Sequence, residues 1–302
     1  MPLEATCESN DGVKIHYKYS PNLTADACLV LIHGFSGSSD CFKKNIPTLA
    51  QRYSVIAYDL RGHGKSGKSV HGAHVNRLAA DLRDLVSHLK SFLPHSQKLI
   101  GIGCSIGAAV LWSYTELFTC ADFDRFVFVD QAPLQNYAAD GSWGPDKGNY
   151  GCHDAASAAY NQAALTMNFD EANKGLVASC LGYRFSPLEE DQVSASEAEE
   201  DEKFFIAIAE QCDPQWLSKL MADHTQYDHR ETIRHRINIP CLVLAGKRSG
   251  CFPTKGTLET AKLINERHRE TALTIEFESG HWLFYEEPER FNQAILTFTQ
   301  YG

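Results

Sequence analysis

The sequence predicts an α/β protein whose mostly parallel central sheet is flanked by helices and interrupted by a helical insertion. Two observations lead to this fold class. Short apolar runs alternate with helix-like patterns as far as residue 131, which is typical of parallel strands connected by helices. The alternation then stops and resumes only near residue 240. We therefore expect one sheet built from two separate stretches of the chain.

The strands are predicted from apolar runs of strand length, the later of which are apolar throughout and so fit a sheet covered on both faces. They occur at 13–19, 27–32, 54–59, 98–103, 125–130, 240–245 and 273–277. The clearest helix between them carries leucines at 78, 82, 85 and 89, spaced by three and four residues.

The insertion is predicted to be helical because no apolar strand run appears in it. An acidic segment at 197–202 leads into an apolar stretch, and we interpret it as the solvated start of a helix. The resulting division is a core formed by 1–132, a helical insertion at 133–236, and the second part of the core at 237–302.

Composition and charge argue against a nucleic-acid-binding, membrane-spanning or secreted protein. The net charge of −10 and the pI near 5.7 argue against nucleic acid as a partner, because phosphate contacts need basic patches. No apolar run is long enough to span a bilayer, and the first residues lack the pattern of a signal peptide. The ten cysteines include no C-x-x-C pair, so we expect reduced thiols in a cytoplasmic protein and no metal site. The oligomeric state is not indicated.

The strongest motif is a G-x-S-x-G turn at 103–107, placed directly after one predicted strand and directly before a helix-like segment. A nucleophile elbow needs this arrangement, because a strained strand-to-helix turn exposes the hydroxyl and the glycines avoid clashes. Ser105 is therefore the candidate nucleophile. Cys104 is the rival, but a motif centred on it would place Ile102 and Ile106 where glycines are required.

Two further turns follow predicted strands. The glycine-rich turn at 33–37 can direct a backbone N–H into the site, as half of an oxyanion hole. We interpret His33 as a support for this loop. The turn at 59–66 carries Arg61 and His63, which we also predict to be structural.

His281 is the candidate general base. Of the thirteen histidines it is the only one that follows the last predicted strand in a Gly-His context, from which a loop can reach the elbow. Three others in a charged stretch lack the spacing of a zinc pair and are expected at the surface: His224, His229 and His235.

Taken together, these motifs resemble the α/β-hydrolase superfamily over nearly the whole chain, in the family's order. The insertion lies where that family places its cap domain, after the sixth strand. The resemblance implies that Ser105 is the nucleophile and His281 the base. It also implies an oxyanion hole made by the backbone amides of Phe35 and Ile106, with Gly34 as an alternate.

The triad acid departs from the family's usual pattern. The usual acid position, after the penultimate strand, holds Ser249, and no carboxylate follows before Glu259. A smaller group places the acid after the sixth strand, where this sequence has Asp130. That arrangement is similar to haloalkane dehalogenases and to the fungal lactone hydrolases that open the zearalenone ring. Dehalogenases and epoxide hydrolases use an aspartate nucleophile, so Ser105 argues against both.

The expected function is hydrolysis of a small-molecule carboxylic ester or lactone through an acyl-enzyme, without a metal or organic cofactor. Four alternatives on the same fold stay open: a carbon–carbon bond hydrolase, a perhydrolase or haloperoxidase, a cofactor-free dioxygenase, and a ligand receptor with minimal turnover. Trp143 is a candidate substrate-binding aromatic in the cap, with core packing as its alternative role.

Overall fold

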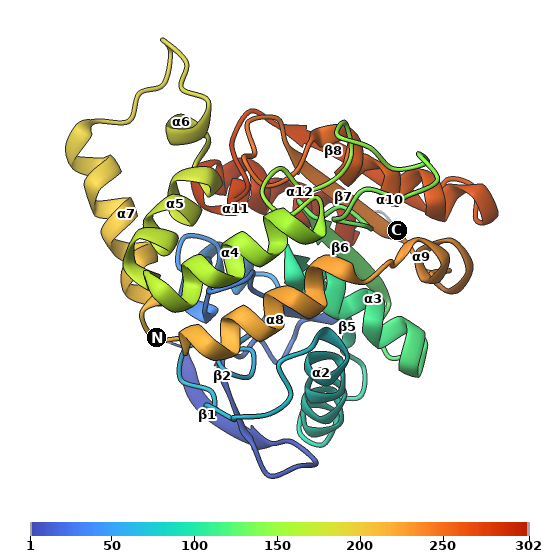
Figure 1. Ribbon diagram of the computed structural model, residues 1–302. Helices are drawn as coiled ribbons and strands as arrows, with labels where there is room; N and C mark the ends of the chain where they lie inside the picture. Colours follow the sequence, from blue (N-terminus) through green and yellow to red (C-terminus); the bar gives the residue numbers. More distant parts are fainter. Residues whose placement is uncertain (1, 301–302) are drawn as a thin grey trace.

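An eight-stranded sheet forms the centre of the protein in the computed structural model, which describes residues 2–300. The strand order is β1-β2-β4-β3-β5-β6-β7-β8. The strands are β1 (Leu3–Glu8), β2 (Lys14–Ser20), β3 (Ala27–Ile32), β4 (Ser54–Tyr58), β5 (Lys98–Cys104), β6 (Arg125–Val129), β7 (Cys241–Gly246) and β8 (Ala272–Phe277). The sheet crosses the molecule from β1 at the lower left of Figure 1 to β8 at the upper right.

The strands from β3 to β8 pair in parallel, and β2 joins β1 and β4 in antiparallel pairs. Every residue of β3, β4, β6 and β7 is buried, as predicted from their uninterrupted apolar sequences. The seven predicted strands are confirmed, with ends that shift by at most one residue. The strand β1 is a further element. It lies at the sheet edge, and its six residues are mostly exposed, so they carry no apolar signal.

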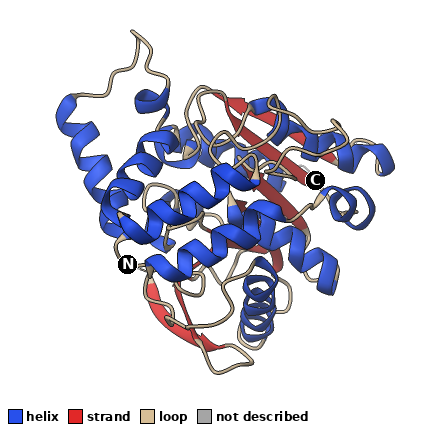
Figure 2. Cartoon of the chain, viewed as in Figure 1, coloured by secondary structure: helices blue, strands red, loops and turns tan. Residues whose placement is uncertain are grey.

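Helices cover both faces of the sheet (Figures 1 and 2). On one face α2 (Val75–Lys90), α3 (Ile106–Phe118) and α10 (Thr254–Arg267) share one apolar core with the sheet. On the other face a second core contains α1 (Ile46–Leu49), α11 (Leu283–Glu286) and α12 (Pro288–Gln300), together with the 3-10 turn η1 (Ser39–Phe42). The predicted fold class is thus confirmed.

The segment between β6 and β7 is helical, as expected, and contains no strand within the described residues. Its helices are α4 (Ala155–Met167), α5 (Phe169–Cys180), α6 (Gly182–Phe185), α7 (Ala195–Ala209), α8 (Pro214–Gln226) and α9 (Arg230–Arg236). Figure 1 shows α4 and α8 side by side, while α9 packs against α3 and α10 of the core. The division of the chain into separate core and cap domains stays a prediction.

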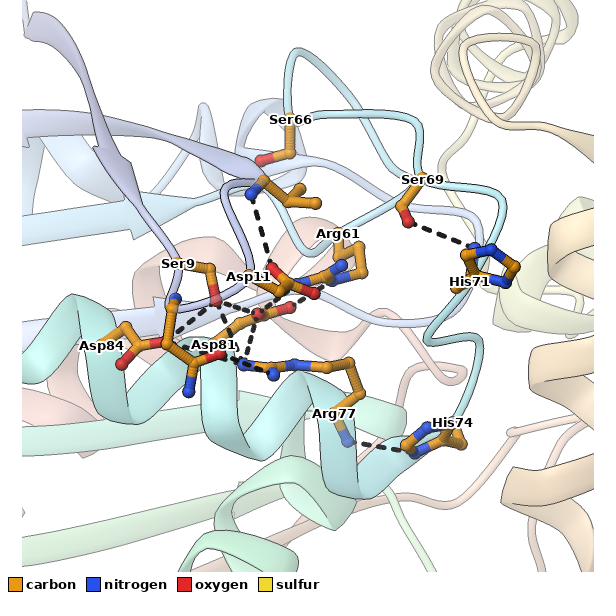
Figure 3. A network of polar contacts seen from close by, with 12 residues as sticks. Ser9, Asp11, Arg61, Ser66, Ser69, His71, His74, Arg77, Asp81 and Asp84 are labelled. Atoms are coloured by element: carbon orange, nitrogen blue, oxygen red, sulfur yellow. Dashed lines mark hydrogen bonds and ion pairs between the residues drawn. The ribbon is translucent and has the colours of Figure 1, made fainter.

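The turn after β4 is held by a buried ionic network (Figure 3). The Arg61 guanidinium donates to both carboxylate oxygens of Asp81 on α2, at 2.7 and 2.8 Å, and to Asp11 at 2.7 Å. His63 Nδ1 lies 2.9 Å from the Arg61 carbonyl oxygen, and burial lowers the pKa of this ring to about 3. Both residues therefore hold the turn in place, as predicted from the sequence.

None of the helices within residues 2–300 combines the length and the hydrophobicity needed to cross a bilayer. All ten cysteines are free, and nine of them are buried. The tenth, Cys251, is partly exposed and lies beside the candidate base.

Candidate active site

Ser105 lies at the junction of β5 and α3 in a strained backbone conformation, with φ of 54° and ψ of −125°. The two flanking glycines are sterically required. A Cβ on Gly103 would lie 2.4 Å from the carbonyl carbon of Gly107, and one on Gly107 would lie 2.4 Å from the carbonyl oxygen of Ile32. Such contacts are far inside van der Waals distance, so this turn has the geometry that a nucleophile elbow needs.

Cys104 is a poor rival to Ser105. Its side chain is fully buried, and this burial raises the pKa of the thiol well above its ordinary value. The thiol therefore stays protonated and covered, whereas the thiolate is the nucleophilic form. Ser105 is also mostly buried, but it lines the central cavity.

Asp130 and His281 come together although they are 151 positions apart in sequence. The Oδ2 atom of Asp130 lies 2.7 Å from Nδ1 of His281, and the other carboxylate oxygen accepts the backbone N–H of Gly246 at 2.9 Å. Asp130 follows β6 with a φ of 45°, a strained conformation that directs its carboxylate at the sheet edge. Both side chains are buried.

Ser249, at the family's usual acid position, stabilises the turn in which it lies. Its hydroxyl oxygen accepts the backbone N–H groups of Cys251 at 3.2 Å and of Phe252 at 3.3 Å. The sequence argument for Asp130 relied on the absence of a carboxylate in this turn. In the structure, the Asp130 carboxylate lies 2.7 Å from the imidazole of His281.

Burial lowers the pKa of His281, but the adjacent Cys251 thiolate and the hydrogen bond to Asp130 raise it by more, so the pKa lies above its ordinary value. The imidazole therefore interacts with two side chains, those of Asp130 and Cys251. Ser105 and His281 line the same cavity, and no hydrogen bond joins their side chains within residues 2–300. Such contacts are often long in unliganded enzymes and tighten around a substrate.

Backbone N–H groups are available for an oxyanion beside Ser105. Ile106 is the first residue of α3, and within the described residues neither its N–H nor that of Phe35 donates to a protein acceptor. Gly34 lies so close to the elbow that a Cβ on it would be 3.2 Å from Cβ of Ser105. The loop containing Gly34 and Phe35 is supported by His33, whose Nε2 accepts the Leu60 N–H at 2.9 Å.

A cavity of about 670 Å³ lies over Ser105 and His281, a volume that suits a drug-sized molecule. Side chains of α4, α5 and α8 form much of its wall, including Leu165, Leu176 and Met221. Trp143 is not among the residues that line this cavity. It is buried in a small cluster with Ala132, Leu134 and Phe252.

Two of the three histidines expected at the surface are buried, so that prediction was wrong for them. His229 packs its ring against Trp112, with the centroids 5.2 Å apart, and His224 lines the cavity. Burial lowers the pKa of each ring to about 3, so both are neutral. The cause is the packing of the α8–α9 connection against the core, which a charged local sequence does not reveal. His235 is exposed, as predicted.

Three residues near His281 were missed because no local motif marks them. The Sγ atoms of Cys180 and Cys251 lie 3.7 Å apart, and both side chains line the cavity beside His281. A hydrogen bond from Cys180 and the positive charge of His281 lower the pKa of the Cys251 thiol. Glu286 joins the His281 loop to α6, accepting the N–H of Gly280 at 2.9 Å and that of Gly182 at 2.9 Å.

We expect Glu286→Gln to change the pH dependence of stability. Burial raises the pKa of Glu286 to about 7, above its ordinary value of 4.5. A raised folded-state pKa stabilises the protein at low pH, and this stabilisation is lost as the pH rises from about 5 to about 8. The variant keeps an acceptor oxygen without a charge to bury. Its stability relative to the wild type should therefore improve by about 1–3 kcal/mol over that interval, after allowance for partial exposure.

Denaturant unfolding of both proteins at pH 5 and pH 8 measures this difference. The matched control is Glu289→Gln, an exposed residue on α12. If Glu286→Gln and Glu289→Gln change stability equally at the two pH values, Glu286 does not carry the burial cost assigned to it.

Comparison with known proteins agrees with this fold. A family model described as alpha/beta hydrolase fold matches residues 28–288. A putative non-heme chloroperoxidase of Synechocystis is 25% identical, over 99% of this chain and all of the relative. Among solved structures, a bromoperoxidase from Bacillus anthracis matches with a TM-score of 0.82 and 20% identity, over 99% of this chain and all of that one.

An esterase from Exiguobacterium antarcticum matches with a TM-score of 0.80 and 18% identity, over 98% of this chain and 99% of that one. The two structures share the fold at low sequence identity. The family match, which spans both parts of the core and the insertion between them, decides the family. The chain belongs to the α/β hydrolase fold family.

Proposed function

We propose that this protein hydrolyses a carboxylic ester or lactone through a Ser105–His281–Asp130 triad. The observation that carries the proposal is the 2.7 Å hydrogen bond between Asp130 and His281 beside a cavity that also contains the strained Ser105. A nucleophile, its base and an orienting carboxylate on one sheet edge form the constellation used for acyl transfer.

In the first step, His281 takes the proton of the Ser105 hydroxyl as its oxygen attacks the substrate carbonyl. Asp130 holds Nδ1 of the ring, so Nε2 is the nitrogen that accepts that proton. Asp130 then stabilises the imidazolium through its hydrogen bond with Nδ1 until the leaving alkoxide receives the proton.

The developing oxyanion needs donors placed in advance. The unpaired N–H groups of Phe35 and Ile106 fit this role, at about 3–4 kcal/mol of transition-state stabilisation per donor, with Gly34 as the alternate. A second cycle, in which His281 activates water, releases the acid from Ser105. No step requires a metal or organic cofactor.

The cavity supports a medium-sized, largely apolar ester or lactone as the substrate. Its wall contains Leu165, Met167, Leu176, Met221 and Phe252. Polar side chains that could orient a carbonyl or hydroxyl substituent also line it, and His224 and Asn161 are among them. We propose such a small molecule, rather than nucleic acid or membrane, as the partner.

A second candidate function is perhydrolysis, in which hydrogen peroxide replaces water as the attacker of the acyl-enzyme and yields a peracid. The haloperoxidase names of a full-length relative and of a solved structure with the same fold favour it. The same triad would serve, so the choice depends on which nucleophile the cavity admits.

A substrate screen tests both candidates. We expect turnover of aryl esters and macrolactones, with acyl-chain preference set by the cavity, and Ser105→Ala as the background. Parallel reactions with a short carboxylic acid, hydrogen peroxide and bromide measure peracid-dependent bromination. Hydrolysis without bromination supports the first candidate, and dominant bromination supports the second. The absence of Ser105-dependent turnover in every arm would contradict both.

We also propose a reducing compartment such as the cytoplasm. The support is that all ten cysteines are free, including a pair of sulfurs only 3.7 Å apart.

A further inference from the structure

Three potential metal ligands converge on the cavity from distant parts of the chain. Cys180 ends α5, Cys251 lies in the turn after β7, and His281 follows β8. One ligand atom of each lies within 4.8 Å of the other two. The cluster therefore joins the helical insertion to the core directly at the candidate base.

The separation of the two sulfurs suits a shared ion. Zinc bound tetrahedrally by thiolates at about 2.3 Å holds two sulfurs about 3.8 Å apart. The Sγ atoms of Cys180 and Cys251 are 3.7 Å apart. A disulfide would need them at about 2.05 Å, so the separation of these two sulfurs matches that of an ion between them and not that of a disulfide.

The imidazole is also oriented as a ligand. Asp130 occupies Nδ1 of His281 at 2.7 Å, and the Gly246 N–H fixes the carboxylate in turn. Nε2 is the remaining ring nitrogen, and the imidazole also interacts with the Cys251 side chain. A carboxylate that orients a histidine by its other nitrogen is the usual outer-shell support of a zinc ligand.

The geometry points to a Zn²⁺ site formed by Cys180, Cys251 and His281, which switches the enzyme off when it is filled. Two thiolates and an imidazole are a donor set that suits zinc. Binding releases two protons to solvent, one from the Cys180 thiol and one from the Cys251–His281 pair, and the two thiolate charges balance the ion, which lowers the cost of burying it. Three protein ligands leave one tetrahedral position open to the cavity water.

The inhibitory part of the inference rests on the proposed function. In that mechanism the lone pair on Nε2 accepts the proton of Ser105, and a zinc ion would occupy the same lone pair. Metal binding and proton acceptance are therefore mutually exclusive at His281. The binding part does not depend on turnover and can be tested without a substrate.

Cobalt replaces zinc as a spectroscopic probe for the binding part. The full-length protein, reduced with a phosphine and freed of metal by a chelator, is titrated with Co²⁺. We expect a thiolate-to-cobalt charge-transfer band, strong visible bands typical of tetrahedral coordination, and loss of both when Zn²⁺ is added. Cys180→Ser and Cys251→Ser should each remove the charge-transfer intensity of one sulfur and weaken binding by more than about tenfold.

Two comparisons separate a specific site from general thiol binding. Cys120→Ser is the matched control, because that thiol is also buried but lies against Asn238, 2.9 Å away, outside the cluster. It should bind cobalt as the wild type does, as should Ser105→Ala. Asp130→Asn, which keeps all three ligands, should weaken binding by about 10–100-fold.

Activity measured at each zinc concentration tests the inhibitory part. We expect wild-type ester hydrolysis to fall in step with site occupancy and to return on chelation, while Cys251→Ser keeps its own metal-free rate at the same zinc concentrations. A wild-type cobalt complex without charge-transfer bands, or with bands that survive both cysteine substitutions, overturns the site. Full occupancy with undiminished hydrolysis overturns the inhibition. If no substrate is turned over, the proposed function fails and the cobalt spectra still decide the site.

Discussion

Replacing Ser105 with alanine is expected to reduce ester hydrolysis by about 10⁴–10⁶-fold, because the residue that forms the acyl-enzyme is removed. The fold should persist, since alanine retains the Cβ in the strained turn and only a hydroxyl that faces the cavity is lost. Turnover of the preferred ester, measured together with the melting temperature, separates the chemical effect from a structural one.

A fluorophosphonate probe identifies the nucleophile independently of the substrate. We expect it to label Ser105 in the wild type and to leave Ser105→Ala unlabelled. The structure adds a rival that the motif did not suggest, because Cys251 is the thiol beside His281, whereas Cys104 is covered and protonated. Labelling or turnover that survives Ser105→Ala and disappears in Cys251→Ser or Cys104→Ala would show that a cysteine is the nucleophile.

The second large effect is expected for Asp130→Asn, with a loss of about 10⁴-fold in turnover. Asparagine can still accept the Gly246 N–H through its Oδ1 atom, so the local fold should be kept. Its amide would face Nδ1 of His281 and favour the wrong tautomer, and it would carry no charge to stabilise the imidazolium. Turnover of one substrate with a good leaving group and of one with a poor leaving group measures this loss.

Ser249→Ala is the matched control for the position of the acid. Its hydroxyl accepts two backbone N–H groups in the turn after β7, so the substitution should cost about 1 kcal/mol of stability with less than about tenfold effect on turnover. Near-normal turnover in Asp130→Asn would mean that the acid lies elsewhere. A larger loss in Ser249→Ala than in Asp130→Asn would contradict the assignment in the same way.

Local sequence determined most of the scaffold and the places where chemistry can occur. Buried parallel strands are apolar along their whole length, and the elbow needs glycines at both flanks of Ser105, so each feature leaves a mark in a few consecutive residues. The choice of Asp130 also came from the sequence, because the turn that contains Ser249 has no carboxylate.

Tertiary packing decided what no short segment encodes. The edge strand β1 has exposed residues and thus no apolar pattern, and the burial of His224 and His229 results from the docking of α8 and α9. Trp143 packs in a small cluster with Ala132, Leu134 and Phe252 and does not line the cavity, which its local sequence does not reveal.

The surroundings of His281 show most clearly what the sequence alone does not predict. Cys180 and Cys251 are 71 residues apart, and neither has a partner within a short motif, yet their sulfurs come within 3.7 Å. The sequence does not distinguish Glu286 from an ordinary surface glutamate of a helix. Its pKa is raised only because the folded chain buries it against Gly182 and Gly280. The sequence by itself determined seven of the eight strands and the elbow, because periodicity and turn chemistry are local, and its resemblance to a known family indicated the three triad candidates. The tertiary structure alone decided which thiols and carboxylates surround the base, because that depends on where distant segments meet.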